Sequence, residues 1–520
     1  MLLPVIDLSG LQLYFAGHPA ADLSCALAAA ALALGALRLR ARPALAALCL
    51  AGVALALGLP MAADGFLHHW DERYHALVAR SLLAHPLHPA LRAPLLGGPA
   101  DALDPGDLDW PLATVWLHKP PLALLLMALG RAALGPGELA LRVPSLLLHA
   151  GAVLACAALG PLLFGRERGR AAGLWAALLY ASNGELLALA TGRVPTDHPD
   201  SVLISLTTIG ALAALRAARA VTPAGEGEQG VMITPSRTAG LALLCGALAG
   251  AAVLAKSFPG LTALGVLVIA LPWSRARAAS LRVLLFALAA CAAVALPWTL
   301  WTRHAFPAQA AREAAYALRH FGEALEGHRG GPLFHLARLP RFFGEASPLA
   351  LVWLLWRGRL SAPGAALPAG RVLALWIATP YALFTAAATK MDAYPLVASA
   401  AICLCLGELL AEWLPRIADR AREGRERAIA ALVCAALLLL PLRFTVFERW
   451  RPFAREAGEL ARAERYRKLS TRLGPGPGLL HSIDAPVEAM FYTGWLAIER
   501  PPTAAEEAAA RARGWRVERE

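Results

Sequence analysis

Residues 43–63 read PALAALCLAGVALALGLPMAA and contain no charged side chain. An α-helix needs roughly 20 mostly apolar residues to cross the hydrocarbon core of a membrane. The rest of the chain has the same character, because 58% of its 520 residues are hydrophobic, 17% are charged and the mean hydropathy is +0.52. These values exclude intrinsic disorder, collagen and a disulfide-stapled secreted scaffold. They predict an all-α polytopic membrane protein.

Apolar runs of similar length recur on both sides of this segment. We predict about 12 transmembrane helices, near residues 20–37, 43–63, 142–164, 171–190, 201–215, 239–255, 257–273, 282–301, 340–356, 372–389, 395–414 and 428–442. The eight cysteines are interpreted as small residues of these helices. Cys403 and Cys405 are too close in sequence for a CxxC redox or zinc pair.

The arginines indicate how the helices are oriented. The chain has 49 basic and 37 acidic residues, and the basic ones cluster between apolar runs, near residues 38–42, 166–170, 216–219, 275–282, 357–371 and 416–427. This is the positive-inside pattern of membrane proteins, so the net positive charge does not indicate a nucleic acid partner. The pattern places these clusters in the cytoplasm and the segments 64–141, 191–200, 302–339 and 390–394 on the outer side.

Two regions are predicted from this topology. Residues 1–442 form a membrane domain whose first outer loop, 64–141, carries interfacial helices; within it, 121–134 is apolar but too short to cross. Residues 443–520 are more polar and are predicted to form a small soluble α/β module on the outer side.

Carboxylates at the ends of membrane helices are candidates for function, because charge is unfavourable there. Asp71 and Glu72 follow the first long span and suit general-base work or a divalent cation. Their alternative role is interaction with the dipole of a helix N-terminus. Asp197 begins another span at its outer end, where it is a catalytic candidate, an N-cap, or both.

Lysine is rare in this chain and unevenly placed. Of the four lysines, Lys119, Lys256 and Lys390 lie at predicted outer helix ends. Ammonium groups that converge there would form a receptor for a phosphate at membrane level. The alternative is that each lysine extends separately from a helix end to the interface. Most of the 14 histidines also lie on the predicted outer side, but they lack metal-ligand spacing, so solvated loops explain most of them.

Six short motifs occur in order on the predicted outer face: Asp71–Ala76, His118–Leu122, Leu141–Ser145, Thr196–Asp197, Leu254–Lys256 and Lys390–Pro395. In this order the chain resembles bacterial membrane glycosyltransferases of the GT-C fold. It is most similar to the branch that contains the undecaprenyl-phosphate aminoarabinose transferases of lipid A and the protein O-mannosyltransferases. The resemblance covers roughly residues 43–500 and includes Phe491–Gly494 in the tail.

The resemblance implies a polyprenyl-phosphate-sugar-dependent glycosyltransferase in the bacterial inner membrane. Such an enzyme uses its donor on the non-cytoplasmic face and passes the sugar to a lipid, glycan or protein acceptor. By the resemblance, Asp71 matches the essential first-loop aspartate, Lys119 the lysine that contacts the donor phosphate, and Asp197 the acid at a later outer turn. Glu72 completes the carboxylate pair, and Lys256, Lys390 and Tyr394 are expected to support the donor phosphate electrostatically.

The chain departs from the family at one metal ligand. His118 stands where the family often has a glutamate that binds metal, and Tyr74 stands where an arginine is common. No counterpart of the second metal ligand is evident near residues 316–321. His118 is therefore our candidate ligand for a divalent metal. The sequence does not decide whether this metal is required, and no other cofactor is expected.

Two other classes of protein share part of this pattern. A secondary transporter would also have about twelve spans, but it should show internal repeats and charged groups at the bilayer midplane. A non-catalytic lipid-binding subunit of an envelope pathway would be distinguished by an Asp71→Asn variant that keeps its activity in cells.

Overall fold

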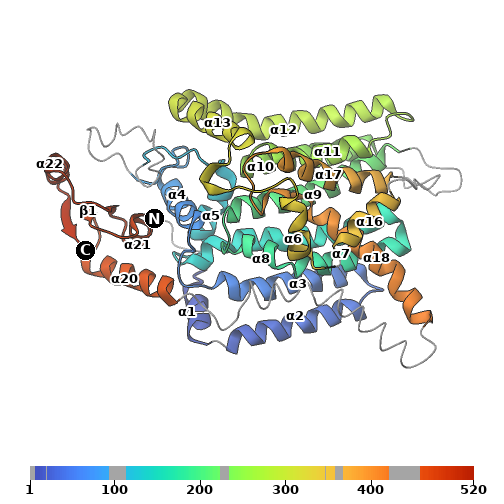
Figure 1. Cartoon of the computed structure of the whole chain (residues 1–520), viewed down its shortest axis with the longest axis horizontal. Coiled ribbons are helices and arrows are strands. Elements are labelled where there is room, and N and C mark those ends of the chain that lie inside the picture. Colours follow the sequence, from blue (N-terminus) through green and yellow to red (C-terminus); the bar gives the residue numbers. More distant parts are fainter. Residues whose placement is uncertain are drawn as a thin grey trace.

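The computed structural model describes residues 6–18, 20–92, 113–222, 234–345, 347–357, 367–420 and 457–520. Most of these residues are helical, and the long helices lie side by side in one bundle (Figure 1). Within the described residues, eight helical segments are long and apolar enough to cross a membrane. They are α2 (Ala20–Arg38), α3 (Pro43–Ala62), α6 (Glu138–Phe164), α9 (Asp197–Ala220), α10 (Pro235–Lys256), α12 (Arg277–Ala305), α17 (Ala369–Ala386), and the segment Tyr394–Pro415, in which η5 (Tyr394–Ala398) continues into α18 (Ser399–Arg420).

Of the roughly 12 predicted spans, these eight are confirmed as long apolar helices, and three others are each divided into two helices. Residues 171–190 form two helices, α7 (Arg166–Ala181) and α8 (Gly184–Ala190); 257–273 form η3 (Phe258–Leu261) and α11 (Thr262–Ala270); 340–356 form α15 (Leu339–Phe343) and α16 (Pro348–Arg357). Asn183 causes the first break, because its side chain accepts the N–H groups of Glu185 and Leu186 and so begins a new helix. The predicted span 428–442 lies outside the described residues.

Small residues let the central helices approach closely. A Cβ atom on Gly160 of α6 would lie 2.3 Å from the carbonyl oxygen of Gly169 in α7. Gly173, one turn further along α7, has the same close contact with α6, where a Cβ would lie 2.2 Å from the carbonyl oxygen of Ala157. Backbones that touch in this way gain packing that lipid cannot supply, which explains the glycines in this apolar pair.

The two ends of the bundle differ. The helices α4 (Asp71–Ala84), α5 (Pro121–Leu134) and α13 (Pro307–Gly322) gather at one end, which we call the outer-loop end (Figure 1). The Arg-rich connections between α2 and α3 and between α6 and α7 lie at the other end (Figure 1). Two short helices, η4 (Leu325–Gly327) and α14 (Phe334–Ala337), follow α13. The predicted outer segments therefore share one end of the molecule.

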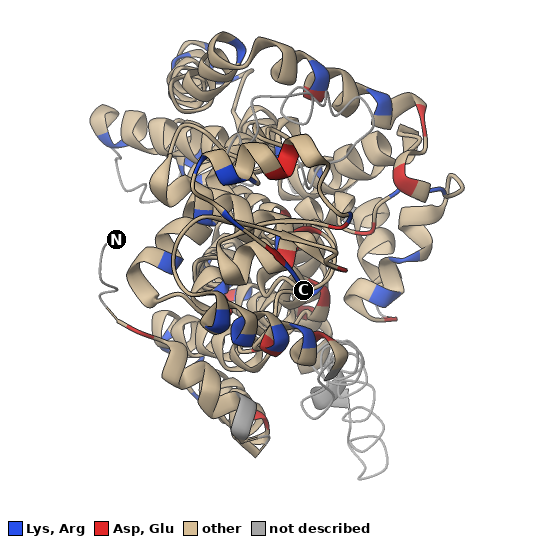
Figure 2. Cartoon of the chain, turned by 90° about the vertical axis from the view of Figure 1, so that its left-hand side faces the viewer, with Lys and Arg blue, Asp and Glu red and all other residues tan. Residues whose placement is uncertain are grey.

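The tail contains the predicted small α/β module, while its proposed boundary at 442/443 lies outside the described residues. The module comprises α20 (Ala457–Leu473), β1 (Gly478–His481), α21 (Pro486–Thr493), β2 (Leu496–Ile498), α22 (Ala504–Ala512) and β3 (Arg516–Arg519). Its three strands are parallel in the order β2-β1-β3, with Leu479 opposite both Leu496 and Val517. Seen from the outer-loop end, the module lies in front of the bundle and carries both basic and acidic residues (Figure 2).

Hydrogen bonds join the module to the first outer loop. Arg80 of α4 donates hydrogen bonds to the backbone carbonyls of Met490 and Phe491, at 3.0 and 2.5 Å, at the end of α21. Glu138, the first residue of α6, accepts a hydrogen bond of 2.6 Å from Tyr492 Oη. The other oxygen of Glu138 accepts one of 2.6 Å from Gln12 in α1 (Ser9–Gly17). The module thus shares its contacts with the helices that carry the outer loop.

We expect Arg80→Met to loosen this contact. The change removes the Arg80 donor from the carbonyls of Met490 and Phe491, and loss of a hydrogen bond to a buried group typically costs about 1–3 kcal/mol. The midpoint of thermal unfolding of the purified protein should fall by several degrees. In the matched control, Arg511→Met removes an exposed pair with Glu507, and its midpoint should change little. Equal midpoints for both variants would contradict the docking role of Arg80.

Candidate active site

Asp71 begins α4 directly after a strained residue. Trp70 has φ 75° and ψ −120°, a conformation that a residue with a side chain adopts only where its surroundings enforce it. Asp71 Oδ2 accepts a hydrogen bond of 2.9 Å from the backbone N–H of Thr196 and lies 3.9 Å from Lys119 Nζ. A quarter of the Asp71 side chain is exposed. The carboxylate is therefore fixed on one side and open on the other.

The charge state of Asp71 follows from these neighbours. Burial by itself raises the pKa of Asp71, but the charges of Lys119, His75 and His118 lower it, as does the Thr196 N–H, and the net pKa lies well below the usual range. Asp71 is therefore ionised at neutral pH. This is the form that can accept a proton.

A second ion pair of lysine and carboxylate lies beside the first. Lys256 Nζ, at the end of α10, is 2.5 Å from Asp200 Oδ2 and 5.3 Å from the ring centre of Tyr394. The hydroxyl of Thr196 donates to Asp200, while the N–H of Thr196 donates to Asp71. Thr196 thus joins the pairs Asp71–Lys119 and Asp200–Lys256. Three residues predicted to bind phosphate, Lys119, Lys256 and Tyr394, belong to this group.

Lys390 has a different environment from the one we predicted. Its ammonium donates to the backbone carbonyls of Phe384 at 3.1 Å, Thr385 at 2.5 Å and Ala387, all at the C-terminal end of α17. Positive charge at this position satisfies carbonyls that the helix leaves without partners. In the structure Lys390 therefore caps the end of α17, and its predicted contact with a donor phosphate stays a prediction.

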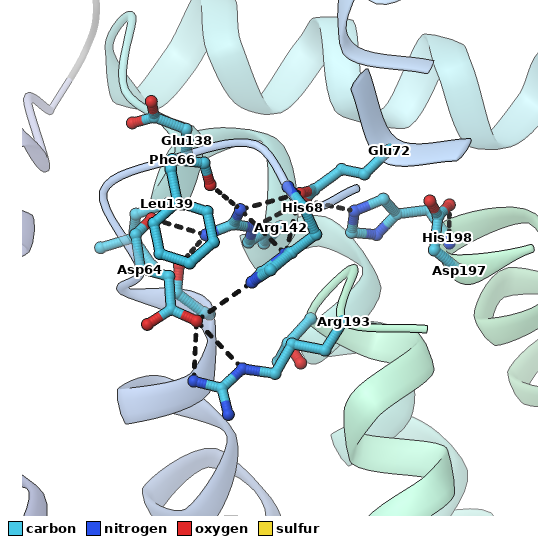
Figure 3. A network of polar contacts seen from close by, with 12 residues as sticks. Asp64, Phe66, His68, Glu72, Glu138, Leu139, Arg142, Arg193, Asp197 and His198 are labelled. Carbon is cyan, nitrogen blue, oxygen red and sulfur yellow. Dashed lines mark hydrogen bonds and ion pairs between the residues drawn. The ribbon is translucent and has the colours of Figure 1, made fainter. Parts of the chain in front are cut away.

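Glu72, the second predicted catalytic carboxylate, is fully buried, and Figure 3 shows it beside Arg142 and His68. Arg142 of α6 donates to both of its oxygens, from Nε at 2.6 Å and from Nη2 at 2.8 Å. The remaining N–H groups of Arg142 reach the carbonyls of Ala62, Asp64 and Phe66. Glu72 and Arg142 therefore hold the connection between α3 and α4 against α6, and Glu72 offers no exposed oxygen to a substrate.

Asp197 lies behind Asp71 in the interior. It begins α9 and is fully buried, and its Oδ1 is 2.8 Å from Nδ1 of His75 on α4. The next residue, His198, lies 3.0 Å from Ser145 Oγ and 3.4 Å from Glu72 Oε1 (Figure 3). Asp197 therefore directly follows Thr196, whose N–H binds Asp71, and it is fully buried with no exposed oxygen.

His118, the predicted metal ligand, pairs with α13. Its Nδ1 lies 3.3 Å from Glu313 Oε2, and its ring centre is 5.7 Å from that of Tyr316. Burial lowers the pKa of His118, and the charge of Lys119 lowers it further. Within the described ranges no three His, Cys, Asp or Glu side chains are grouped to hold a metal ion. A divalent metal at His118 therefore stays a prediction.

Sequence reasoning missed four residues of this site: His75, Thr196, Asp200 and Glu313. Asp200 had a visible signal, since it lies three residues after Asp197 on the same helix face. His75 likewise lies one turn after Asp71. Glu313 gave no signal, because its partner His118 is 195 positions away.

Comparison with known proteins places this geometry in context. No protein family model matches the chain. The chain is 29% identical over 387 residues to the undecaprenyl phosphate-α-4-amino-4-deoxy-L-arabinose arabinosyl transferase of Pseudomonas aeruginosa strain UCBPP-PA14, covering 70% of the chain and 61% of the relative. The counterpart from Pseudomonas paraeruginosa matches at the same identity and coverage.

Among solved structures, ArnT from Cupriavidus metallidurans bound to undecaprenyl phosphate aligns with a TM-score of 0.58 at 15% identity, covering 90% of this chain and 88% of ArnT. The archaeal oligosaccharyltransferase AglB from Archaeoglobus fulgidus, in complex with an inhibitory peptide and a dolichol-phosphate, aligns with a TM-score of 0.51 at 13% identity, covering 91% and 69%.

The chain is distantly similar in sequence to these arabinosyl transferases. Its fold is GT-C-like, and it is a multi-pass membrane protein. The matched region spans less than two thirds of the curated arabinosyl transferases. The structural similarity to ArnT confirms the predicted GT-C-like fold.

The site around Asp71 depends on a glycine that packs against Glu72. A Cβ atom on Gly192 would lie 2.2 Å from Glu72 Oε1, and the φ of Gly192 is +80°, where side chains are strained. We expect Gly192→Ala to destabilise the protein by about 3 kcal/mol through strain and overpacking. Thermal unfolding in detergent measures this loss.

The control for this experiment is Gly240→Ala in α10. Its added Cβ meets nothing within 4 Å, so alanine should leave stability unchanged or raise it slightly, since alanine favours helix. Stability of Gly192→Ala equal to that of the control would contradict the tight packing around Glu72.

Proposed function

We propose that the protein is a glycosyltransferase that moves a sugar from a polyprenyl-phosphate donor to an acceptor on the non-cytoplasmic face of the bacterial inner membrane. The observation that carries the proposal is the partly exposed pair of Asp71 and Lys119, 3.9 Å apart, at the outer-loop end of a GT-C-like bundle. The ArnT structure with a similar fold binds undecaprenyl phosphate, which supports a donor of this class.

Lys119 and Lys256 suit a donor phosphate because each is a point charge at the end of a helical segment. Lys119 precedes Pro120 and Pro121, whose fixed φ angles restrict the backbone of Lys119 to extended conformations. The flexible side chain therefore starts from a rigid base at the level where a lipid-anchored phosphate arrives. Tyr394, beside Lys256, supplies a ring and a hydroxyl to the same region.

In the proposed reaction an acceptor hydroxyl attacks the anomeric carbon of the donor sugar. The new bond joins the acceptor oxygen to that carbon, the bond from the carbon to the phosphate oxygen breaks, and the hydroxyl proton passes to Asp71. Polyprenyl phosphate leaves with the bonding electrons, and Lys119 stabilises its added negative charge. A donor phosphate on Lys119 also offsets the charge that lowers the pKa of Asp71, so donor binding strengthens the base.

The acceptor is proposed only as a class: a lipid, glycan or protein that carries a hydroxyl group. A transporter or a non-catalytic lipid-binding subunit would bind the donor without breaking its glycosidic bond. This difference defines the experiment.

The full chain, purified in lipid, is incubated with a set of radiolabelled undecaprenyl-phosphate sugars and with membrane extracts as acceptor. We expect release of free undecaprenyl phosphate and movement of label to an acceptor, both abolished in Asp71→Asn. Donor that binds but is never cleaved would overturn the proposal in favour of a binding or transport role.

Lys119→Ala should remove stabilisation of the leaving phosphate. Loss of a single preorganised donor typically costs on the order of 3 kcal/mol, which is about a hundredfold in rate. Lys119→Arg should restore part of the rate, because its guanidinium is longer and planar. The control is Lys468→Ala, an exposed lysine of α20. Full activity of Lys119→Ala at saturating donor would remove the reason to place phosphate at this lysine.

The pH dependence of kcat/KM tests Asp71 as the base. Asp71 must be ionised, and its pKa is held well below the usual range, so activity in the wild type should persist as pH falls to about 4. In Lys119→Ala the charge that most strongly lowers the pKa of Asp71 is removed, while burial still raises this pKa. The acidic limb of the profile should therefore move to higher pH, whereas Lys119→Arg should keep it low. Superimposable profiles would contradict this assignment.

A further inference from the structure

The backbone turn at Thr196, whose N–H binds Asp71, is also bound by His75 through Asp197. Asp71 and His75 lie four positions apart on α4 and so share one helix face. Asp71 accepts a hydrogen bond of 2.9 Å from Thr196 N–H, and His75 Nδ1 lies 2.8 Å from Oδ1 of Asp197, the next residue. Asp71 and His75, on one face of α4, therefore hydrogen-bond to two consecutive residues at the start of α9.

This turn does not adopt a relaxed conformation. Thr196 has φ 70° and Asp197 φ 21°, and neither is a glycine. Backbone in this region persists only where several contacts enforce it. The two hydrogen bonds from α4 are such contacts, together with the hydroxyl of Thr196 on Asp200.

The bond between His75 and Asp197 lies where water does not replace it, because each side chain is 1% exposed. Among the described residues, His75 Nε2 and Asp197 Oδ2 have no hydrogen-bond partner. The contact at Nδ1 is thus the one polar link the structure gives the His75 ring. The ring also packs beside the indole of Trp116, with ring centres 5.8 Å apart, which fixes its orientation from the segment that carries Lys119.

We propose that His75 is a positioning residue for the transfer reaction: by holding Asp197, it keeps the Thr196 N–H on one oxygen of Asp71 and leaves the other oxygen free for the acceptor proton. The inference rests on the proposed function, since it assigns a role in that reaction. His75 acts through Thr196 and Asp71 and does not itself exchange the proton. Donor binding depends on Lys119 and Lys256, which His75 does not contact in the interactions described.

Three variants separate this role from simple packing. His75→Asn retains a nitrogen donor near the position of Nδ1, His75→Gln retains one near the position of Nε2, and His75→Leu retains neither. Each is measured as purified full chain in lipid, with labelled undecaprenyl-phosphate sugar as donor, for kcat, donor KM and the midpoint of thermal unfolding.

We expect His75→Leu and His75→Gln to lower kcat at least tenfold while donor KM stays within about twofold, the pattern of an interaction that matters only in the transition state. His75→Asn should recover most of kcat. Equal activity of the Asn and Gln variants, or a loss that follows the thermal midpoint alone, would overturn the positioning role. Absence of turnover by the wild type would instead overturn the proposed function, and this inference with it.

Discussion

The buried ion pair of Arg142 and Glu72 is the constraint on which the outer-loop end depends. Both side chains have no exposed surface, and every N–H direction of the guanidinium that the structure describes ends on a carboxylate, a ring nitrogen or a backbone carbonyl. Removing one partner of such a pair typically costs roughly 3–5 kcal/mol, because the other charge stays buried without compensation. The pair therefore cannot separate without loss of the local fold, and it fixes where α4 begins.

From that fixed point the position of Asp71 follows in short steps. Glu72 is anchored, so the residue before it must emerge at the start of α4, and Trp70 absorbs the change of direction with a strained backbone. Gly192 touches Glu72 and leads into the turn of Thr196. The same anchor thus sets both Asp71 and the N–H that binds it. Nearer the C-terminal end of α4, Arg80 binds the C-terminal module, so α4 is held by both the membrane helices and the module.

Features of the fold and the site could be predicted from sequence where they depend on local patterns, and could not where they depend on residues far apart in the chain. Hydrophobic runs and arginine clusters are local patterns, and they gave the helices and the shared end of Asp71 and Lys119. Breaks in helices were missed where one residue decides them, as Asn183 does between α7 and α8. The internal partners of Glu72 and Lys390 could not be predicted for a related reason. A charge at a helix end is equally compatible with a substrate and with an internal partner, and the partners found, Arg142 and the end of α17, are known only from the fold.

The arrangement of charges also bears on why two lysine–carboxylate pairs lie together. Asp71 with Lys119 and Asp200 with Lys256 form a neutral group, which limits the unfavourable energy of partly burying four charges. In the proposed reaction the donor is a phosphodiester with one negative charge, and the product is a phosphate monoester with more, while Asp71 becomes neutral as it takes the proton. Negative charge therefore moves from the base to the leaving group. Lys119 lies 3.9 Å from Asp71, and as Asp71 becomes neutral the charge on the leaving phosphate grows, so the attraction of Lys119 for the phosphate is stronger in the later state. An interaction that strengthens along the reaction accelerates it, whereas one that binds both states equally does not.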